Sequence, residues 1–260
     1  MQSAVLRGVE AEPVWVEVCV GSGLPGMSIV GMADTAVKEA QERVRSALRV
    51  SGFSMPSMKV VVNLAPGNIR KTGSGFDLPI ALGVLVATAQ VPEEAVRGRL
   101  VIGELSLQGA VRPVIGNLAF ALCAKRMGCQ FVTAMQKPAP IRGLVQMGLR
   151  TLGSLHLADP FDELSSRGGT GATPAAKPAA DYKDISGHDI AKRSLQIAAA
   201  GNHGVLMMGP PGSGKTMLAS RLVSILPPLT EEEMLEAAVV HSVAGRDIDD
   251  ILLGIRPFRS

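Results

Sequence analysis

Short apolar runs of strand length alternate with longer amphipathic segments over residues 1–163. Runs of four to eight residues that are rich in Val and Ile, and bounded by Gly or Pro, are typical of strands. The expected strands are residues 14–20, 27–30, 59–64 and 130–133, and residues 100–107 with Gly109 and Val111 predict a hairpin. Strands that alternate with helices predict an α/β domain with a mixed sheet.

Three segments between these strands have the marks of helices. Asp34 is a suitable N-cap for a helix through Arg49, because its carboxylate can accept a hydrogen bond from the first turn. A glycine-rich loop, residues 73–75, leads into an apolar helix from Asp77. A third helix is expected near residues 117–127.

The helix after Asp34 carries charges of both signs, and two interpretations are open. Its surface could face DNA, or it could be a solvated helix face with pairs four residues apart, such as Glu39 with Arg43. Charge patterning alone favours the solvated face. The charged residues are Lys38, Glu39, Glu42, Arg43, Arg45 and Arg49.

Residues 164–180 read LSSRGGTGATPAAKPAA and show no apolar periodicity, which predicts a flexible linker. The linker divides the chain into a domain of residues 1–163 and a segment of residues 181–260. In the second segment, residues 189–200 predict a helix, and the apolar run 205–208 predicts a strand.

A complete phosphate-binding loop follows that apolar run. It consists of Gly209, Pro210, Pro211, Gly212, Ser213, Gly214, Lys215 and Thr216, which match G-x-x-x-x-G-K-[ST]. Glycines let the backbone curl so that several N–H groups face one anion, and the following helix adds its positive end. Lys215 is the candidate catalytic group, because it can reach the β- and γ-phosphates, and the Thr216 hydroxyl can hold Mg²⁺. The expected cofactors are therefore ATP and Mg²⁺.

The helix after the loop carries Met217 and ends at a pair of prolines, residues 227 and 228. Thr230 and Glu233 then form a capping box that opens a helix through about residue 240. The acidic residues 231–233 are therefore expected to stabilise the start of this helix, and no catalytic role is assigned to them.

Composition narrows the class of protein. The 260 residues are 47% hydrophobic and only 3% aromatic, so aliphatic side chains must build the core. The apolar run 78–89 is too short to cross a membrane, and residues 1–7 resemble no secretory signal. We therefore expect a soluble cytoplasmic protein with no membrane partner. Residues 1–180 carry 18 Lys and Arg against 13 Asp and Glu, which is compatible with a nucleic-acid partner without indicating one.

The three cysteines include no C-x-x-C pair, and the histidines have no suitably spaced ligand partner, so no zinc or iron site is predicted. Cys19, Cys123 and Cys129 are interpreted as small buried apolar residues.

Taken together, several motifs resemble those of ComM/YifB-type magnesium-chelatase-like proteins, a bacterial family. These motifs are GLPG (23–26), VKEAQERVRSA (37–47), NLAP (63–66), FDLPIA (76–81), GEL (103–105), the phosphate loop, HSVAG (241–245) and RPFR (256–259). The resemblance implies a Lon-protease-like domain, of the ribosomal protein S5 domain 2 type, followed by an incomplete P-loop AAA+ NTPase domain. It also implies DNA as a partner of full-length relatives, which resemble hexameric helicases active in branch migration during natural transformation.

The same resemblance places residues 181–187 at the lip of the adenine pocket, where Ile185 would pack on the base. His188 follows this segment and could lie near the base, but its position before a helix favours a structural role at the helix start.

Peptidase activity is not expected. A Lon-type site needs a serine at the start of the apolar helix and a lysine as its base, but this chain has Asp77 there. Ser74 lies three positions early, and Lys125 is not where that pattern puts the base, so we expect no proton acceptor for a serine.

Full ATP hydrolysis also needs a carboxylate at the end of a second apolar strand and an arginine from a neighbouring subunit. Asp247, Asp249 and Asp250 do not follow such a strand, and the family continues beyond Ser260, so we expect nucleotide binding with weak or absent turnover. Two alternatives stay open: a non-catalytic module that binds DNA or a partner and carries a vestigial ATPase, and a magnesium-chelatase subunit.

Overall fold

The computed structural model describes residues 1–165 and 181–258. The chain divides into two compact units, one made of Met1–Gly168 with Ser242–Gly245 and one made of Gly169–His241 with Arg246–Ser260. The expected linker lies almost wholly outside the described residues, so the linker itself stays a prediction.

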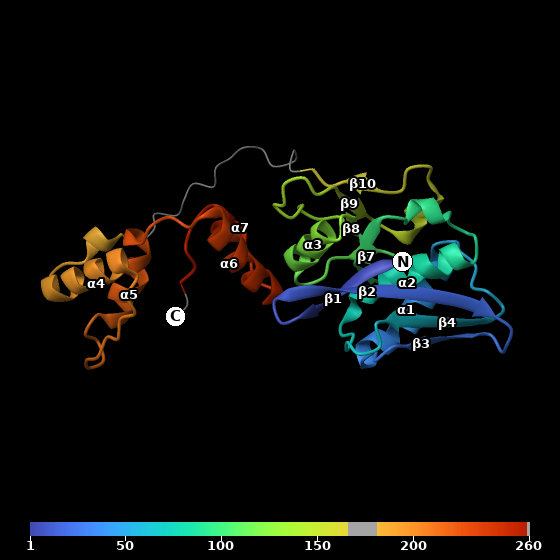
Figure 1. Cartoon of the computed structure of the whole chain (residues 1–260), viewed down its shortest axis with the longest axis horizontal. Helices are drawn as coiled ribbons and strands as arrows, with labels where there is room; N and C mark the ends of the chain where they lie inside the picture. Colours follow the sequence, from blue (N-terminus) through green and yellow to red (C-terminus); the bar gives the residue numbers. More distant parts are fainter. Residues whose placement is uncertain (166–180, 259–260) are drawn as a thin grey trace. The chain divides into compact units, whose positions relative to one another are not determined.

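The N-terminal unit is built on an eight-stranded mixed sheet (Figure 1). Its strand order is β10-β9-β8-β5-β1-β2-β4-β3. Both parallel and antiparallel neighbours occur, as the sequence predicts: β2 is antiparallel to β1 and β4, whereas β8 is parallel to β5 and β9. The strands are β1 (Gln2–Arg7), β2 (Glu10–Gly21), β3 (Gly26–Val30), β4 (Lys59–Ala65), β5 (Arg99–Val101), β8 (Gln130–Ala134), β9 (Gln146–Leu149) and β10 (Asp162–Glu163).

Helix α1 (Thr35–Val50) begins where the sequence predicts. The Asp34 side chain caps it by accepting a 2.8 Å hydrogen bond from the backbone N–H of Val37. Helix α3 (Asn117–Arg126) also matches its predicted segment. Between them in the chain, helix α2 (Asp77–Ala87) is buried over nearly its whole length.

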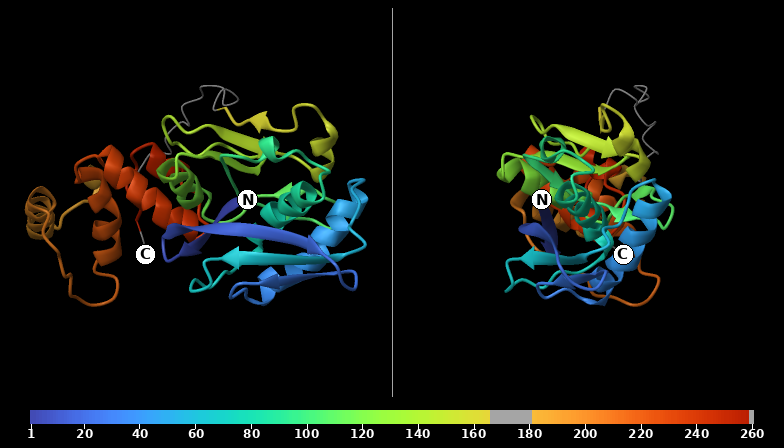
Figure 2. Two further views of the ribbon diagram at one scale, coloured as in Figure 1. Left: turned by 45° about the vertical axis from the view of Figure 1, so that its right-hand side comes forward. Right: turned by 90° about the vertical axis from the view of Figure 1, so that its right-hand side faces the viewer.

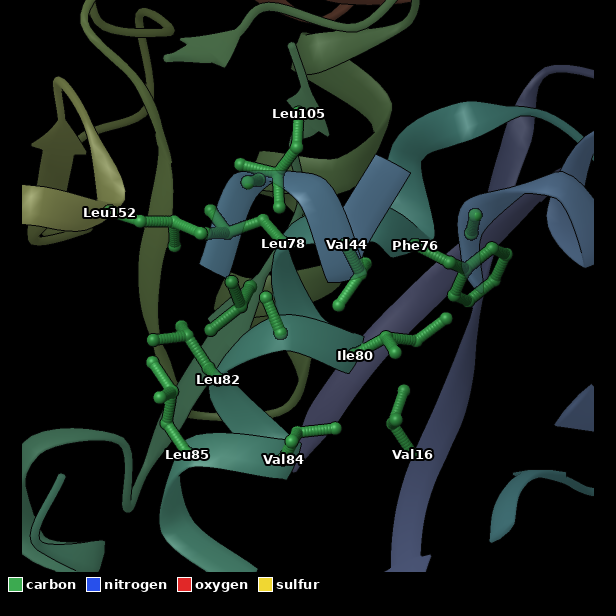
Figure 3. Close-up of a cluster of buried hydrophobic side chains, with 14 of the residues drawn as sticks. Val16, Val44, Phe76, Leu78, Ile80, Leu82, Val84, Leu85, Leu105 and Leu152 are labelled. Atoms are coloured by element: carbon green, nitrogen blue, oxygen red, sulfur yellow. The ribbon is translucent and has the colours of Figure 1, made fainter. Parts of the chain in front are cut away.

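Because α2 is apolar on every side, it forms the centre of the hydrophobic core. Figure 3 shows Ile80 of this helix between Val16 of β2 and Val44 of α1, and Leu78 beside Leu105 and Leu152. The apolar run that contains α2 is thus a core helix. No helix among residues 1–165 and 181–258 has the length and apolar character that a membrane span requires.

The predicted hairpin over residues 100–107 is only partly correct. β5 joins the large sheet, and the hairpin is a separate two-stranded sheet of β6 (Glu104–Leu105) and β7 (Val111–Arg112). Gly103 lies between the two, and a Cβ atom there would lie 3.0 Å from side-chain carbons of both Leu78 and Val111. Glycine at this position therefore allows α2 to pack closely against the chain.

The described part of the C-terminal unit is helical. It contains α4 (Asp189–Gly201), α5 (Lys215–Leu222), α6 (Glu231–Val243) and α7 (Asp249–Leu252), with 3-10 turns at Tyr182–Asp184 and Val223–Ile225. A small hydrophobic cluster in this unit contains the buried side chains of Tyr182, Ile185, Leu195 and Leu218. The Tyr182 hydroxyl donates a 2.7 Å hydrogen bond to the carbonyl of Lys192, which ties the first turn to α4.

The predicted strand at residues 205–208 is wrong in this structure. The segment between α4 and α5 runs as a loop (Figure 2), and Leu206 and Met208 are each 85% exposed. A strand requires hydrogen bonds to a neighbouring strand, and the described residues of this unit offer none. The apolar run therefore has the composition of a strand without a partner for its backbone.

Candidate functional site

The phosphate loop runs from Gly209 to the first turn of α5, and its curl depends on glycine. Gly212 and Gly214 have φ angles of 80° and 77°, in the left-handed region where other residues are strained. A Cβ atom on Gly209 would lie 3.1 Å from the Ser213 hydroxyl oxygen. The backbone of this segment thus has the conformation that its glycines predict.

Free backbone donors gather where the loop enters α5. Within the described part of the chain, the N–H groups of Gly214, Lys215 and Thr216 donate to no protein acceptor, whereas the Leu218 N–H closes the first turn on Gly214 at 2.9 Å. Unpaired N–H groups at a helix start, together with the helix dipole, attract an anion. The geometry therefore suits a phosphate.

The side chain of Lys215 folds back over the loop. Its ammonium group donates to the carbonyl oxygens of Gly209 at 2.8 Å and Pro210 at 2.7 Å. A third hydrogen bond, 3.2 Å long, joins it to the Ser213 hydroxyl. These contacts hold the positive charge against the loop, and a phosphate group would offer the same ammonium stronger, charged acceptors.

Thr216 and Met217, the next two residues, differ in exposure. Thr216 is exposed, and its hydroxyl has no hydrogen-bond partner among the described residues, so it is free to contact a metal ion. Met217 is partly buried against the small core of the unit. The Thr216 hydroxyl is thus accessible to a ligand, and the Met217 side chain packs against the small core of the unit.

Ile185 is placed inside the small core, with 3% of its surface exposed. It packs with Tyr182 and Leu195, at the end of the short turn that precedes α4. Its expected contact with an adenine ring stays a prediction, and the residue has a structural role besides.

His188 lies closer to the loop than its place in the sequence suggests. It is the N-cap of α4 with a φ of 55°, which agrees with the expected helix-start role. Its ring nitrogen Nε2 also lies 3.4 Å from the position of a Cβ atom on Gly214. No pattern in the sequence indicates this contact, because 26 positions separate the two residues and only the fold of the unit joins them.

Asp77, for which the resemblance implies the position of a Lon-type serine, has a structural role. The Asp77 carboxylate is fully buried and accepts hydrogen bonds from Arg43 Nε at 2.7 Å and Nη2 at 2.9 Å. A third bond, 3.2 Å long, comes from the Leu105 N–H. Burial raises the pKa of Asp77, although these hydrogen bonds oppose the shift. The ion pair joins α1 to α2. Asp77 is a closer partner of Arg43 than the predicted Glu39, whose Oε2 atom lies 3.8 Å from Arg43 Nη1.

Ser74 corrects one sequence expectation. Its hydroxyl donates a hydrogen bond to the Glu104 carboxylate, so a proton acceptor is present after all. Lys125 is not part of this pair, because its ammonium group donates to the Arg142 carbonyl at 2.9 Å. A lone carboxylate next to the hydroxyl does not reproduce the Ser–Lys arrangement of a Lon-type site.

The acidic residues of the C-terminal unit are explained locally. The Thr230 hydroxyl accepts a 3.2 Å hydrogen bond from the Glu233 N–H, and the Glu233 carboxylate accepts one of 2.9 Å from the Thr230 N–H. This confirms the predicted capping box, although α6 extends to Val243. The carboxylate of Asp247 accepts from the N–H of Asp249 and so helps to begin α7.

Cysteine placement partly contradicts the sequence interpretation. Cys123 and Cys129 are buried, but Cys19 is exposed on β2. No group of three or more His, Cys, Asp or Glu side chains within residues 1–165 and 181–258 is arranged to hold a metal ion.

Comparison with known families identifies the chain. The family model described as subunit ChlI of Mg-chelatase matches residues 16–137, and the one described as magnesium chelatase, subunit ChlI, matches residues 181–260. This chain belongs to the magnesium-chelatase ChlI family. The phosphate loop lies within the second match, and the Arg43–Asp77 pair lies within the first.

Individual relatives of this ChlI-family chain match almost all of it. YifB of Salmonella typhimurium is 41% identical over 258 residues, which cover 97% of this chain and 51% of the relative. YifB of Escherichia coli is 38% identical over 261 residues, with coverage of 97% and 51%. Competence protein ComM of Haemophilus influenzae is 39% identical over 268 residues, with coverage of 99% and 52%.

The resemblance to ComM and YifB proteins is thus confirmed, and the chain spans about half the length of the curated relatives it matches.

Proposed function

We propose that this chain binds ATP with Mg²⁺ at the loop from Gly209 to Thr216, as the first part of an AAA+ ATPase module. One observation carries the proposal: the N–H groups of Gly214, Lys215 and Thr216 are free at the start of α5, beside the ammonium group of Lys215. Four positive or partially positive groups in one short segment fit the β- and γ-phosphates of a nucleotide.

Each residue of the loop has a separate task in this proposal. Lys215 leaves the carbonyls of Gly209 and Pro210 and neutralises phosphate charge. Ser213, which already contacts the ammonium group, keeps the lysine over the loop during this exchange. Thr216 supplies a hydroxyl ligand to Mg²⁺, and the metal ion, when bound, withdraws charge from the phosphate oxygens.

For the base of the nucleotide, we propose the side of the loop next to Met217 and Ile185. Met217 Cε lies 3.4 Å from the position of a Cβ on Gly214, so its thioether borders the loop directly. Ile185 would contribute to the apolar wall behind it.

The activity of the whole protein is a proposal of wider scope. By its family, a full-length relative would be a hexameric, DNA-dependent ATPase, and residues 1–163 would form its Lon-protease-like domain of S5 domain 2 type. Competence protein ComM of Haemophilus influenzae, whose match covers 99% of this chain, supports a role in competence through its name. For the phosphate loop of this chain, nucleotide binding is the expected activity.

Equilibrium binding of a fluorescent ATP analogue with Mg²⁺ tests the proposal. Replacing Lys215 by Ala should weaken binding by about ten- to a hundredfold, because a charge-assisted contact to phosphate is worth about 1.5–3 kcal/mol. Lys38→Ala is the control, because Lys38 is an exposed lysine of α1 and belongs neither to the phosphate loop nor to residues 181–187. Equal affinity of the wild type and the Lys215 variant would exclude this site.

A second function is favoured by a separate observation. The N-terminal unit has a complete hydrophobic core around α2, whereas the C-terminal unit leaves Leu206 and Met208 exposed. A chain of this kind could act by binding DNA or a partner through its N-terminal unit, without nucleotide. Salt-dependent DNA binding that is unchanged in the Lys215→Ala chain without ATP would support this alternative, and DNA binding that requires ATP would exclude it.

A further inference from the structure

The two edge strands of the large sheet in the N-terminal unit differ in charge and length. β10 forms one edge and has only two residues, Asp162 and Glu163, which are both charged and exposed. β3 forms the other edge, and its five residues, GMSIV, carry no charge (Figure 1). A short, charged edge strand discourages pairing with another strand, whereas a longer, uncharged one permits it. β3 is therefore the edge at which the sheet can be extended.

The hydrogen-bond pattern of the sheet determines which backbone groups of β3 face outward. Met1 and Val16 exchange two backbone hydrogen bonds, of 2.9 and 3.2 Å, so the backbone groups of Val16 face β1. Successive residues of a strand face alternate neighbours. Carried through the register of β2 and β4, this alternation directs the backbone groups of Val60 and Val62 toward β3.

Met27 and Ile29 carry the outward backbone groups of β3. In the parallel register, each of the β4 residues that face β3 lies beside one of these two residues. A residue of a parallel pair bonds to the neighbours of the residue beside it, so the bonds from β4 reach Gly26, Ser28 and Val30 instead. The N–H and C=O groups of Met27 and Ile29 thus face away from β4, and no described residue bonds to them.

We propose that β3 pairs with the β3 strand of a second copy of this chain, antiparallel and about a twofold axis at Ser28. In this register Met27 of one copy lies opposite Ile29 of the other, and the two residues exchange both N–H···O=C bonds. The two equivalent pairs use every outward N–H and C=O group of both strands. A shifted register leaves some of these groups unpaired, so the hydrogen-bond pattern selects the twofold arrangement.

The side chains fit this register on both faces of the sheet. Met27 and Ile29 pack against the core of their own unit, so their pairing extends one apolar layer across both copies. On the other face Val30, which is 48% exposed, lies opposite Gly26, where no side chain competes for space. Ser28 lies opposite its own copy, and the two hydroxyls can hydrogen-bond. No like charges meet, and this self-complementarity favours a second copy of the chain as the partner.

The residues at the ends of β3 add exposed apolar surface. Leu24 is 89% exposed and Met32 is 56% exposed. Antiparallel pairing places the end of one β3 beside the start of the other, which brings Met32 of one copy toward Leu24 of its partner. The pairing is nevertheless short, and stable interfaces bury about 1,600 Å², so we expect a weak, reversible dimer.

Sedimentation velocity of the whole chain over a series of concentrations tests the proposal. We expect a monomer–dimer equilibrium that Ser28→Lys weakens by at least about fivefold, because two lysines then lie directly opposite each other. Ser165→Lys is the matched control, since Ser165 is exposed and follows β10 at the other edge of the sheet. A chain that stays monomeric, or a dimer that Ser28→Lys leaves unchanged, would overturn the proposal.

Disulfide crosslinking tests the register without the lysine variant. All proteins should carry Cys19→Ser, because that exposed thiol would otherwise react on its own. Ser28→Cys should crosslink two chains under mild oxidation, since Cβ atoms directly opposite each other are about 4.5–5.5 Å apart. Val30→Cys, on the same face, is the control, because the twofold register separates the two copies of residue 30 along the strands. Equal crosslinking of both variants, or of neither, would contradict the proposed pairing.

Discussion

Strand β4 of the N-terminal unit and residues 205–208 of the C-terminal unit are similar in composition and opposite in burial. In β4, Val60, Val62 and Leu64 are fully buried and alternate with more exposed neighbours. In residues 205–208, Leu206 is 85% exposed and no strand forms. The difference is that β4 lies between β2 and β3, whereas the described part of the other unit contains no strand to pair with.

The comparison shows that an apolar run obtains its stabilisation from neighbours. Burial of a Leu or Val side chain is worth about 1.5–3 kcal/mol, but only where other elements cover it. The core of the N-terminal unit extends over α1, α2 and most of the sheet, whereas the cluster around Ile185 and Leu218 in the described C-terminal unit is much smaller. The N-terminal unit should therefore unfold last, and the substitutions below test this difference.

The largest expected effect is in the N-terminal unit, at the ion pair between helices α1 and α2. Arg43→Leu leaves the buried carboxylate of Asp77 without its bidentate partner, which typically costs about 3–5 kcal/mol. Urea unfolding followed by the fluorescence of Trp15, the only tryptophan, reports on this unit. Arg45→Leu, at an exposed position of the same helix, is the control, and equal losses in both variants would contradict the proposed role of the pair.

A matched pair of core truncations compares the two units directly. Leu82→Ala removes a fully buried side chain of α2 and should cost about 2–5 kcal/mol, because the surrounding core cannot collapse onto the cavity. Leu218→Ala, in the smaller core, should cost less, since fewer neighbours lose contacts. Amide hydrogen exchange resolved by region would measure both, and a larger loss at Leu218 would reverse the comparison.

The exposed run should tolerate polar residues. Leu206→Ser and Met208→Ser should each change the free energy of unfolding by no more than about 0.5 kcal/mol, since neither side chain is buried. Urea midpoints of the single variants measure this change. A loss above that range would mean that residues 205–208 are covered in solution.

The smallest effect is a pH dependence in the N-terminal unit. Lys71 is fully buried, its ammonium group donates to the Pro66 carbonyl, and burial lowers its pKa. Between this lowered pKa and the ordinary lysine value of about 10.4, the unfolded chain holds the proton that the folded chain has released, so stability rises with pH.

Lys71→Met lacks this group and isolates its contribution. The stability of the wild type relative to Lys71→Met should increase between about pH 8 and pH 10, as measured by urea unfolding at both values. A difference that does not change with pH would show that the lysine keeps its ordinary pKa when buried.

Local patterns make much of the fold predictable. The capping carboxylate of Asp34, the alternation in β4 and the capping box of Thr230 and Glu233 each depend on residues within a few positions of one another. Interactions of this range are encoded in the sequence directly, which is why these elements begin near the predicted residues. The sequence does not predict strands β1, β9 and β10, because they are short or carry little alternation.

The same difference between local and distant contacts applies to the candidate site. The phosphate loop is recognisable because its glycines, Lys215 and Thr216 are contiguous, and the conformation of Gly212 and Gly214 is a property of the residue type. The contact between His188 and Gly214, and the pairing of Ser74 with Glu104, are not predictable. Both join residues that are 26 or more positions apart, and no local rule relates them.

By itself, the sequence determined the mixed α/β character, the phosphate loop with its lysine and threonine, and membership in a family whose motifs it carries. The tertiary structure alone decided which carboxylate Arg43 pairs with, that Asp77 is buried, and that residues 205–208 form no strand. The physical reason is that propensity and capping act over one or two turns of chain. Burial and pairing depend instead on which distant segments arrive beside a residue, and in the described C-terminal unit no strand arrives beside the apolar run.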